Sequence, residues 1–130
     1  MFLNIDLNSD VAIYTQMKQQ IIEGIARKEL APGAPLPSVR SLASDLGINL
    51  HTVNKAYQQL KQEGFILIHR QKGVVVHPEG VTPADSVYKE LLHEQLRPLM
   101  AEAICRQMTE DDIQQLVRLT YNTIHSAGEE

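Results

Sequence analysis

The sequence predicts a mostly α-helical chain of the α+β class, in which three helices and a small β-hairpin precede a C-terminal pair of helices. Three observations lead to this prediction. Apolar residues recur every three or four positions in five separate stretches, as they do in amphipathic helices. Two short runs rich in β-branched residues flank a charged turn. A segment containing proline and glycine, residues 78–83, separates the two halves as a linker.

The first helix is expected over residues 10–29, after an extended arm formed by residues 1–9. Asp10 is a plausible N-cap for this helix. The stretch "LAPGAPLP" ends it, because it contains three prolines and a glycine. The inward face of the helix is expected to carry residues spaced three or four apart, namely Tyr14, Met17, Ile21 and Ile25.

Two further helices follow in close succession. Ser38 is expected to cap the first of them, and Gly47 to end it in the left-handed conformation. Asn49 is then the natural N-cap of a helix over residues 50–63, with Gly64 as its stop. This helix should bury Val53, Ala56, Tyr57 and Leu60, and leave His51, Asn54, Lys55, Gln58 and Gln59 elsewhere on its surface.

The segments "FILIH" and "VVVH" predict two strands around the turn "RQKG", which places Arg70, Gln71 and Lys72 at a loop tip. A tight turn joins the second and third helices, and the hairpin follows them directly. Residues 1–77 are therefore expected to form one domain that contains a helix-turn-helix followed by a wing.

Residues 84–130 predict two more helices with long apolar faces. Pro98 should kink the first of them or split it near Arg97, and Thr109 with Asp112 should cap the second. Two helices and a small wing domain cannot cover both faces, so we expect this segment to form a homodimer. The expected interface residues are Val87, Leu91, Leu92, Leu96, Leu99, Met100, Ile104, Ile113, Leu116, Val117 and Tyr121.

Composition excludes several classes of function. No apolar run approaches the roughly 20 residues of a membrane span, and the first residues do not resemble a secretory signal. The single cysteine, Cys105, fits a reducing cytoplasm and is expected to be a buried apolar thiol. An intermolecular disulfide is the alternative. The five histidines lack the spacing of a zinc site. No phosphate loop or nucleophile motif indicates an enzyme, so no metal, cofactor or catalytic residue is expected.

The distribution of charge permits binding to nucleic acid. The net charge is −4, yet residues 1–77 carry 8 basic against 6 acidic side chains, whereas residues 78–130 carry 4 against 10. A helix that begins with Asn49, His51, Thr52 and Asn54 offers donors and acceptors that can read base edges in the major groove. Simple capping by Asn49 and Thr52, and a solvated charged turn at residues 70–73, remain the alternatives.

Residues 14–76 resemble the DNA-binding domain of the GntR family of bacterial transcription regulators. The resemblance lies in Pro32-Gly33, in "LPSVRSLA" from Leu36 to Ala43, in "TVNKAYQQLKQEG" from Thr52 to Gly64, and in Gly73 to Val76. It implies a winged-helix homodimer on a palindromic DNA operator. The positions that it assigns to DNA are Arg40, Asn49, Leu50, His51, Thr52, Asn54, Gln71, Lys72 and Gly73. Ser38, Lys55 and Arg70 complete the residues that we expect to bind DNA.

Two positions depart from the family pattern. Many members have an arginine at the position of Leu50 and a glycine at that of Gln71, so the operator sequence cannot be transferred from them. Leu50 is a candidate for contact with a thymine methyl group. The short C-terminal half resembles the YtrA-type subfamily, in which a helix pair makes the dimer, and the resemblance favours repression. The alternative function is that of a winged-helix module for protein interaction. The sequence does not decide whether a small-molecule effector binds.

Overall fold

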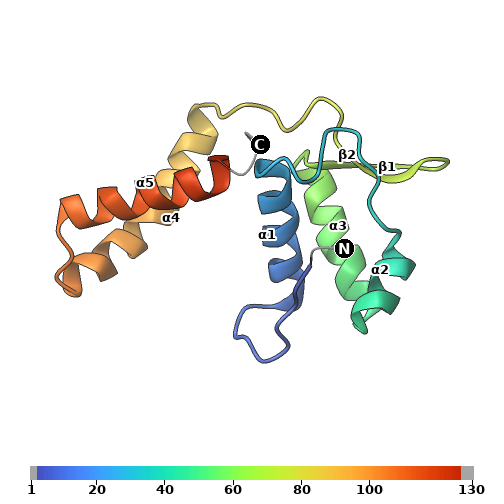
Figure 1. Cartoon of the computed structure of the whole chain (residues 1–130), viewed down its shortest axis with the longest axis horizontal. Helices are drawn as coiled ribbons and strands as arrows, with labels where there is room; N and C mark the ends of the chain where they lie inside the picture. The colour runs from blue at the N-terminus through green and yellow to red at the C-terminus, as the bar shows by residue number, and fades with distance from the viewer. Residues whose placement is uncertain (1–2, 127–130) are drawn as a thin grey trace. The chain divides into compact units, whose positions relative to one another are not determined.

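The computed structural model describes residues 3–126, which form five helices and one two-stranded antiparallel sheet (Figure 1). The fold is therefore mostly α-helical with a small hairpin, as predicted. The chain divides into two compact units, with the boundary between Val81 and Thr82. Unit 1 contains α1 (Ile13–Ala26), α2 (Val39–Leu46), α3 (Leu50–Gln62), β1 (Ile66–His69) and β2 (Gly73–Val76), and unit 2 contains α4 (Ser86–Cys105) and α5 (Glu110–Ser126).

The hydrophobic core lies in unit 1, where α1 and α2 both pack against α3. The side chains predicted to face inward from α3 are fully buried, and Met17, Ile21 and Leu42 complete the centre of the core with them. Their periodicity decides the orientation of the helix, since residues three and four apart share one face. The opposite face of α3 is consequently left to solvent.

The hairpin has a fixed register, in which Ile66 lies opposite Val76 and His69 opposite Gly73. The loop that precedes α2 extends this small sheet. The Leu36 N–H donates to the carbonyl oxygen of Val74 at 2.8 Å, and the Val76 N–H donates to that of Ala34 at 2.9 Å. These bonds attach the wing to the segment that leads into the helix-turn-helix, so the two parts share one scaffold.

The N-terminal arm docks on α1 through two glutamines. The Gln16 amide accepts from the Asp6 N–H and donates to the carbonyl oxygens of Asp6 and Val11, each at 2.9 Å. Gln20 makes the same paired contact with the backbone of Asn4, at 2.7 and 2.8 Å. Because of this docking the prediction for the start of α1 is wrong. The helix begins at Ile13 with Ala12 as N-cap and no side-chain cap, rather than with Asp10 as its N-cap, and it ends at Ala26 rather than near Glu29.

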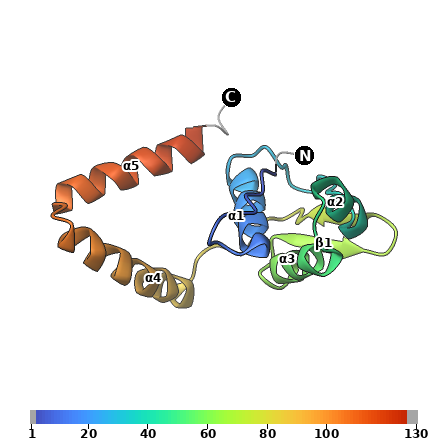
Figure 2. The same ribbon diagram turned by 90° about the horizontal axis from the view of Figure 1, so that it is seen from below.

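Unit 2 consists of two exposed helices. Pro98 lies inside α4 without splitting it. The predicted cap of α5 is present, because the Thr109 N–H donates to Asp112 Oδ2 at 2.9 Å and the Asp112 N–H donates to Thr109 Oγ1 at 3.1 Å. Bonds from the Thr109 backbone and side chain lower the pKa of the Asp112 carboxyl. The two helices diverge from their connecting turn (Figure 2), and no residue of either is buried within the single chain.

Candidate nucleic-acid interface

The exposed ridge of α3 lies opposite the core. His51, Lys55, Gln58 and Gln62 follow one another at intervals of four, three and four residues, so they share the face that points away from the buried side chains. All four are exposed. Asn54 is also exposed and lies on one flank of this ridge. The ridge therefore combines an imidazole, an ammonium and amides, which can donate and accept hydrogen bonds at a base edge or a phosphate.

The N-terminus of α3 is capped in the predicted way. Asn49 Oδ1 accepts from the His51 N–H at 2.8 Å. The cap uses only this oxygen, which leaves the amide nitrogen of Asn49 as a donor on the exposed surface. Thr52 is half-buried one turn further on. Capping and contact with a ligand are thus compatible at Asn49.

Leu50 is the first residue of α3, and 41% of its surface is exposed. An apolar side chain at this place cannot donate a hydrogen bond, but it can contact a methyl group. The side chain at this position is therefore available for apolar contact only.

The start of α2 presents Arg40 next to a capped helix end. Ser38 Oγ accepts from the Ser41 N–H at 3.0 Å, so the predicted cap is confirmed, and the hydroxyl hydrogen of Ser38 can still be donated elsewhere. Gly47 ends α2 with φ 65°, the left-handed conformation that the sequence predicted. Arg40 is exposed, and no carboxylate pairs with it among residues 3–126.

Tyr57 connects α3 with the segment that leads into α2. Its ring is fully buried, and its hydroxyl donates to the carbonyl oxygen of Pro37 at 2.8 Å. Burial raises the pKa of the Tyr57 phenol, because the charged form would lose its hydration. This bond connects the buried face of α3 with Pro37, the residue directly before the Ser38 cap. It holds the two exposed surfaces in one arrangement.

The wing presents a charged tip. Arg70, Gln71 and Lys72 connect β1 with β2, and all three are exposed. Gly73 follows with φ 72°, a left-handed conformation that a β-carbon would strain. The two cations are suited to contact with a phosphate backbone or a minor groove.

The sequence did not predict one contact within this surface. The Nζ atom of Lys55 lies 4.0 Å from the centre of the Tyr14 ring, although the spacing of Tyr14 predicted a core residue. Tyr14 is in fact half-buried at the edge of the core. Periodicity could not reveal this pairing, because it depends on how α1 packs against α3.

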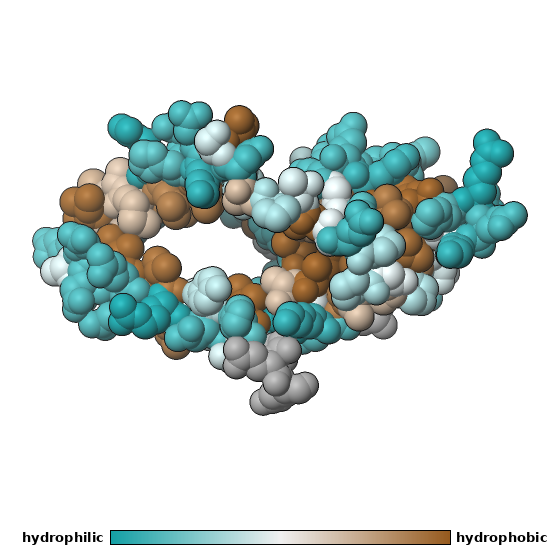
Figure 3. Space-filling view, turned by 90° about the horizontal axis from the view of Figure 1, so that it is seen from above, coloured by the Kyte–Doolittle hydropathy of each residue, from teal (hydrophilic) through white to brown (hydrophobic). Residues whose placement is uncertain are grey.

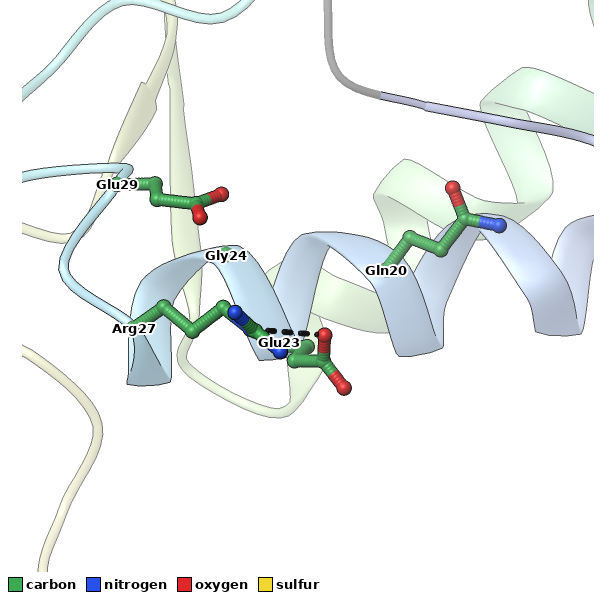
Figure 4. A pocket seen from close by; sticks show the side chains of 5 residues that line it. All are labelled: Gln20, Glu23, Gly24, Arg27 and Glu29. Carbon is green, nitrogen blue, oxygen red and sulfur yellow. Dashed lines mark hydrogen bonds and ion pairs between the residues drawn. The ribbon is translucent and has the colours of Figure 1, made fainter. Parts of the chain in front are cut away.

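A surface hollow of about 270 Å³ lies on a different part of unit 1. Gln20, Glu23, Gly24, Arg27 and Glu29 line it, and Figure 4 shows the ion pair that Arg27 makes with Glu23 at 3.0 Å. The hollow carries two carboxylates and one cation, and its net negative charge would repel a phosphate. The residues that the structure describes include no cluster of three potential metal ligands.

The residues assigned to the dimer interface are exposed or half-buried in the single chain. Leu91 and Leu99 expose 54% and 61% of their surfaces, and apolar side chains gather along this helix pair (Figure 3). Met100 and Ile113 are half-buried. The prediction of a buried thiol is wrong for the single chain, since Cys105 is exposed at the end of α4, where this unit has no core to cover it. No helix within residues 3–126 has the length and apolar character to cross a membrane.

A helix-turn-helix followed by a hairpin, with polar side chains on the exposed ridge of its second helix, defines a winged-helix DNA-binding protein. The model of the family described as bacterial regulatory proteins, gntR family, matches residues 13–76. The transcriptional repressor YtrA of Bacillus subtilis is 36% identical over 101 residues, which cover 78% of each chain. The chain therefore belongs to the GntR family of transcription regulators.

Two solved structures are similar to this chain, and the first of them belongs to the same family. YtrA from Sulfolobus acidocaldarius, a GntR-family transcription factor, is 42% identical and has a TM-score of 0.62, over 78% of this chain and 99% of that one. A protein from Listeria monocytogenes EGD-e described as a transcriptional antiterminator is 26% identical. It has a TM-score of 0.86, over 96% of this chain and 92% of that one. The similarity to both structures extends beyond unit 1.

Proposed function

We propose that the protein is a transcriptional repressor that binds a palindromic DNA operator as a homodimer. In this proposal residues 1–77 bind DNA, residues 78–83 link the parts, and residues 84–130 form the dimer. The protein would act in the cytoplasm, without an enzymatic activity. The observation that carries the proposal is the exposed polar ridge of α3, which lies opposite the buried face formed by Val53, Ala56, Tyr57 and Leu60.

The proposal assigns different roles to different parts of the surface. His51 and Asn54 read base edges, and Leu50 contacts the methyl group of a thymine. Arg40 and the wing tip contact the sugar–phosphate backbone and fix the register of the protein on the duplex. The relative from Bacillus subtilis that bears the name of a repressor supports repression as the outcome of binding.

Homodimer formation is supported by the apolar faces of α4 and α5. Half or more of the surface of Leu91, Leu99 and Leu116 is exposed, and burial of each would contribute on the order of 1 kcal/mol. A second copy of the same helix pair offers a matching apolar surface. A two-fold dimer would hold its recognition helices about 34 Å apart, which is one turn of DNA.

Footprinting on the DNA upstream of the protein's own gene tests the proposal. We expect protection of two half-sites whose centres are about 10 base pairs apart, with affinity that falls steeply as salt rises, because phosphate contacts release counterions. A protein-interaction module would show neither the footprint nor the salt dependence. A dimer in sedimentation with no affinity for any duplex would refute DNA binding while leaving the oligomeric state in place.

A further inference from the structure

The contact between Lys55 and Tyr14 joins the recognition helix to the first helix of the domain. The Nζ atom of Lys55 lies 4.0 Å from the ring centre, well inside the range of about 6 Å over which a ring attracts a cation. Tyr14 stands one residue from the start of α1, and Lys55 lies in the first half of α3. The two side chains therefore meet at the exposed seam between these helices.

The two partners differ in mobility and exposure. The ring of Tyr14 packs against the core cluster on one side, so its position is fixed by the fold. Lys55 is exposed and belongs to the ridge of α3, on the side of the ridge nearest α1. A lysine chain on a helix surface samples many rotamers. The ring consequently restricts the ammonium group to the α1 edge of the ridge.

The charge of Lys55 remains available for a ligand. Among residues 3–126 no carboxylate forms an ion pair with it. Lys18, on the same pair of helices, is different, because it forms an ion pair with Glu63 at 2.9 Å. An aromatic ring holds a cation without neutralising it, whereas a carboxylate cancels its charge.

We propose that Tyr14 is a positioning residue for DNA binding, whose ring holds the Lys55 ammonium at the α1 edge of the recognition helix to bind a phosphate. The inference rests on the proposed function. A base edge would require Lys55 to project along the centre of the ridge, whereas the strands of a duplex flank a helix that lies in the major groove. Preorganisation strengthens binding because less side-chain freedom is lost when the complex forms.

The experiment is a double-mutant cycle on the full-length protein. The variants are Tyr14→Leu, Tyr14→Phe, Lys55→Gln and the combination of Tyr14→Leu with Lys55→Gln. The probe is a mixed-sequence duplex of about 30 base pairs, because phosphate contacts contribute to non-specific binding too. Affinity is measured from about 50 to 200 mM salt, and circular dichroism confirms that each variant is folded.

We expect Tyr14→Leu to weaken binding about two- to five-fold at an unchanged salt slope, while Tyr14→Phe, which keeps the ring, binds as the wild type does. Lys55→Gln should lower the slope of log affinity against log salt by about 0.9, the loss of one phosphate contact. In that background Tyr14→Leu should have no further effect. In a Lys72→Gln background, which alters the distant wing, Tyr14→Leu should keep its full effect.

Three results would overturn the inference. Tyr14→Leu could bind as the wild type does, Tyr14→Phe could weaken binding as much as Tyr14→Leu, or the effect of Tyr14→Leu could persist without Lys55. A wild-type protein that binds no duplex would instead overturn the proposed function, and this inference with it. NMR tests the contact between Lys55 and Tyr14 directly. The ring current of the residue 14 side chain should shift the Lys55 ε-methylene protons upfield in the wild type and in Tyr14→Phe, but not in Tyr14→Leu.

Discussion

Tyr57→Phe removes one hydroxyl from the centre of unit 1 and keeps the buried ring in place. The hydroxyl donates to the carbonyl oxygen of Pro37 at 2.8 Å, and the side chain is fully buried. The substitution therefore deletes a single hydrogen bond and leaves its acceptor without this partner. No cavity larger than one oxygen atom is created, so packing changes little.

The magnitude follows from the hydrogen bond alone. A neutral hydrogen bond contributes about 0.5–1.5 kcal/mol, and an acceptor left without its partner adds to the loss, so we expect the free energy of unfolding to fall by about 1–2 kcal/mol. For a domain of this size each kcal/mol corresponds to roughly 4–8 °C in the melting temperature. Urea and thermal unfolding followed by circular dichroism, at one fixed protein concentration, would measure both quantities.

The matched control is Tyr14→Phe. The Tyr14 hydroxyl makes no hydrogen bond with the residues that the structure describes, so its removal should change the free energy of unfolding by no more than about 0.5 kcal/mol. Equal stability of Tyr57→Phe and the wild type would refute the conclusion that this bond fixes α2 against α3.

The raised pKa of Tyr57 predicts how the free energy of unfolding depends on pH. Burial raises the pKa of Tyr57 above its ordinary value of about 10. The folded state therefore favours the protonated phenol, and this contribution is complete below pH 10 and is lost as pH rises above it. Tyr57→Phe has no such group. Its stability relative to the wild type should consequently improve as pH rises above about 10.

The remaining predictions concern the surfaces that we propose for DNA binding and for the dimer. Arg40→Ala should weaken operator binding by about 1.5–3 kcal/mol in a titration, because it removes a hydrogen bond between charged groups at the DNA backbone; unchanged affinity would exclude that contact. His51→Ala or Asn54→Ala should alter the preferred sequence more than the non-specific affinity, which selection of binding sites for each variant would detect. Leu91→Asp or Leu99→Asp should dissociate the dimer in sedimentation, since a buried carboxylate opposes the interface; a dimeric variant would place the interface elsewhere.

Local features of the fold were predictable because they depend on a few neighbouring residues. Ser38, Gly47 and Asn49 each cap or end a helix through contacts within four residues of chain. The inward face of α3 followed from periodicity alone. These signals also placed the ridge of His51 and Lys55, which is the complement of the buried face.

Features that depend on distant contacts were not predictable. The failure of Asp10 as a helix cap results from Gln16 and Gln20, whose amides hold the backbone of an arm 10 to 16 residues away. The exposure of Cys105 arises because α4 has no core within its own chain. Patterns in a single sequence indicate which face of a helix is apolar and where the helix ends. They do not indicate which other element will cover that face.

The modest charge of the proposed DNA-binding surface explains why an exposed helix pair would serve the proposed function. Residues 34–77 carry 5 basic and 2 acidic side chains, and the whole chain is negative, so one copy can make few phosphate contacts. Joining two copies makes the second half-site contact intramolecular and can strengthen binding about 10²- to 10⁴-fold without any new contact. A variant that dissociates through Leu91→Asp should therefore lose more operator affinity than Arg40→Ala, although the residues that we propose to contact DNA are intact. A monomeric variant that keeps full operator affinity would show that unit 1 binds on its own and that α4 and α5 have another role.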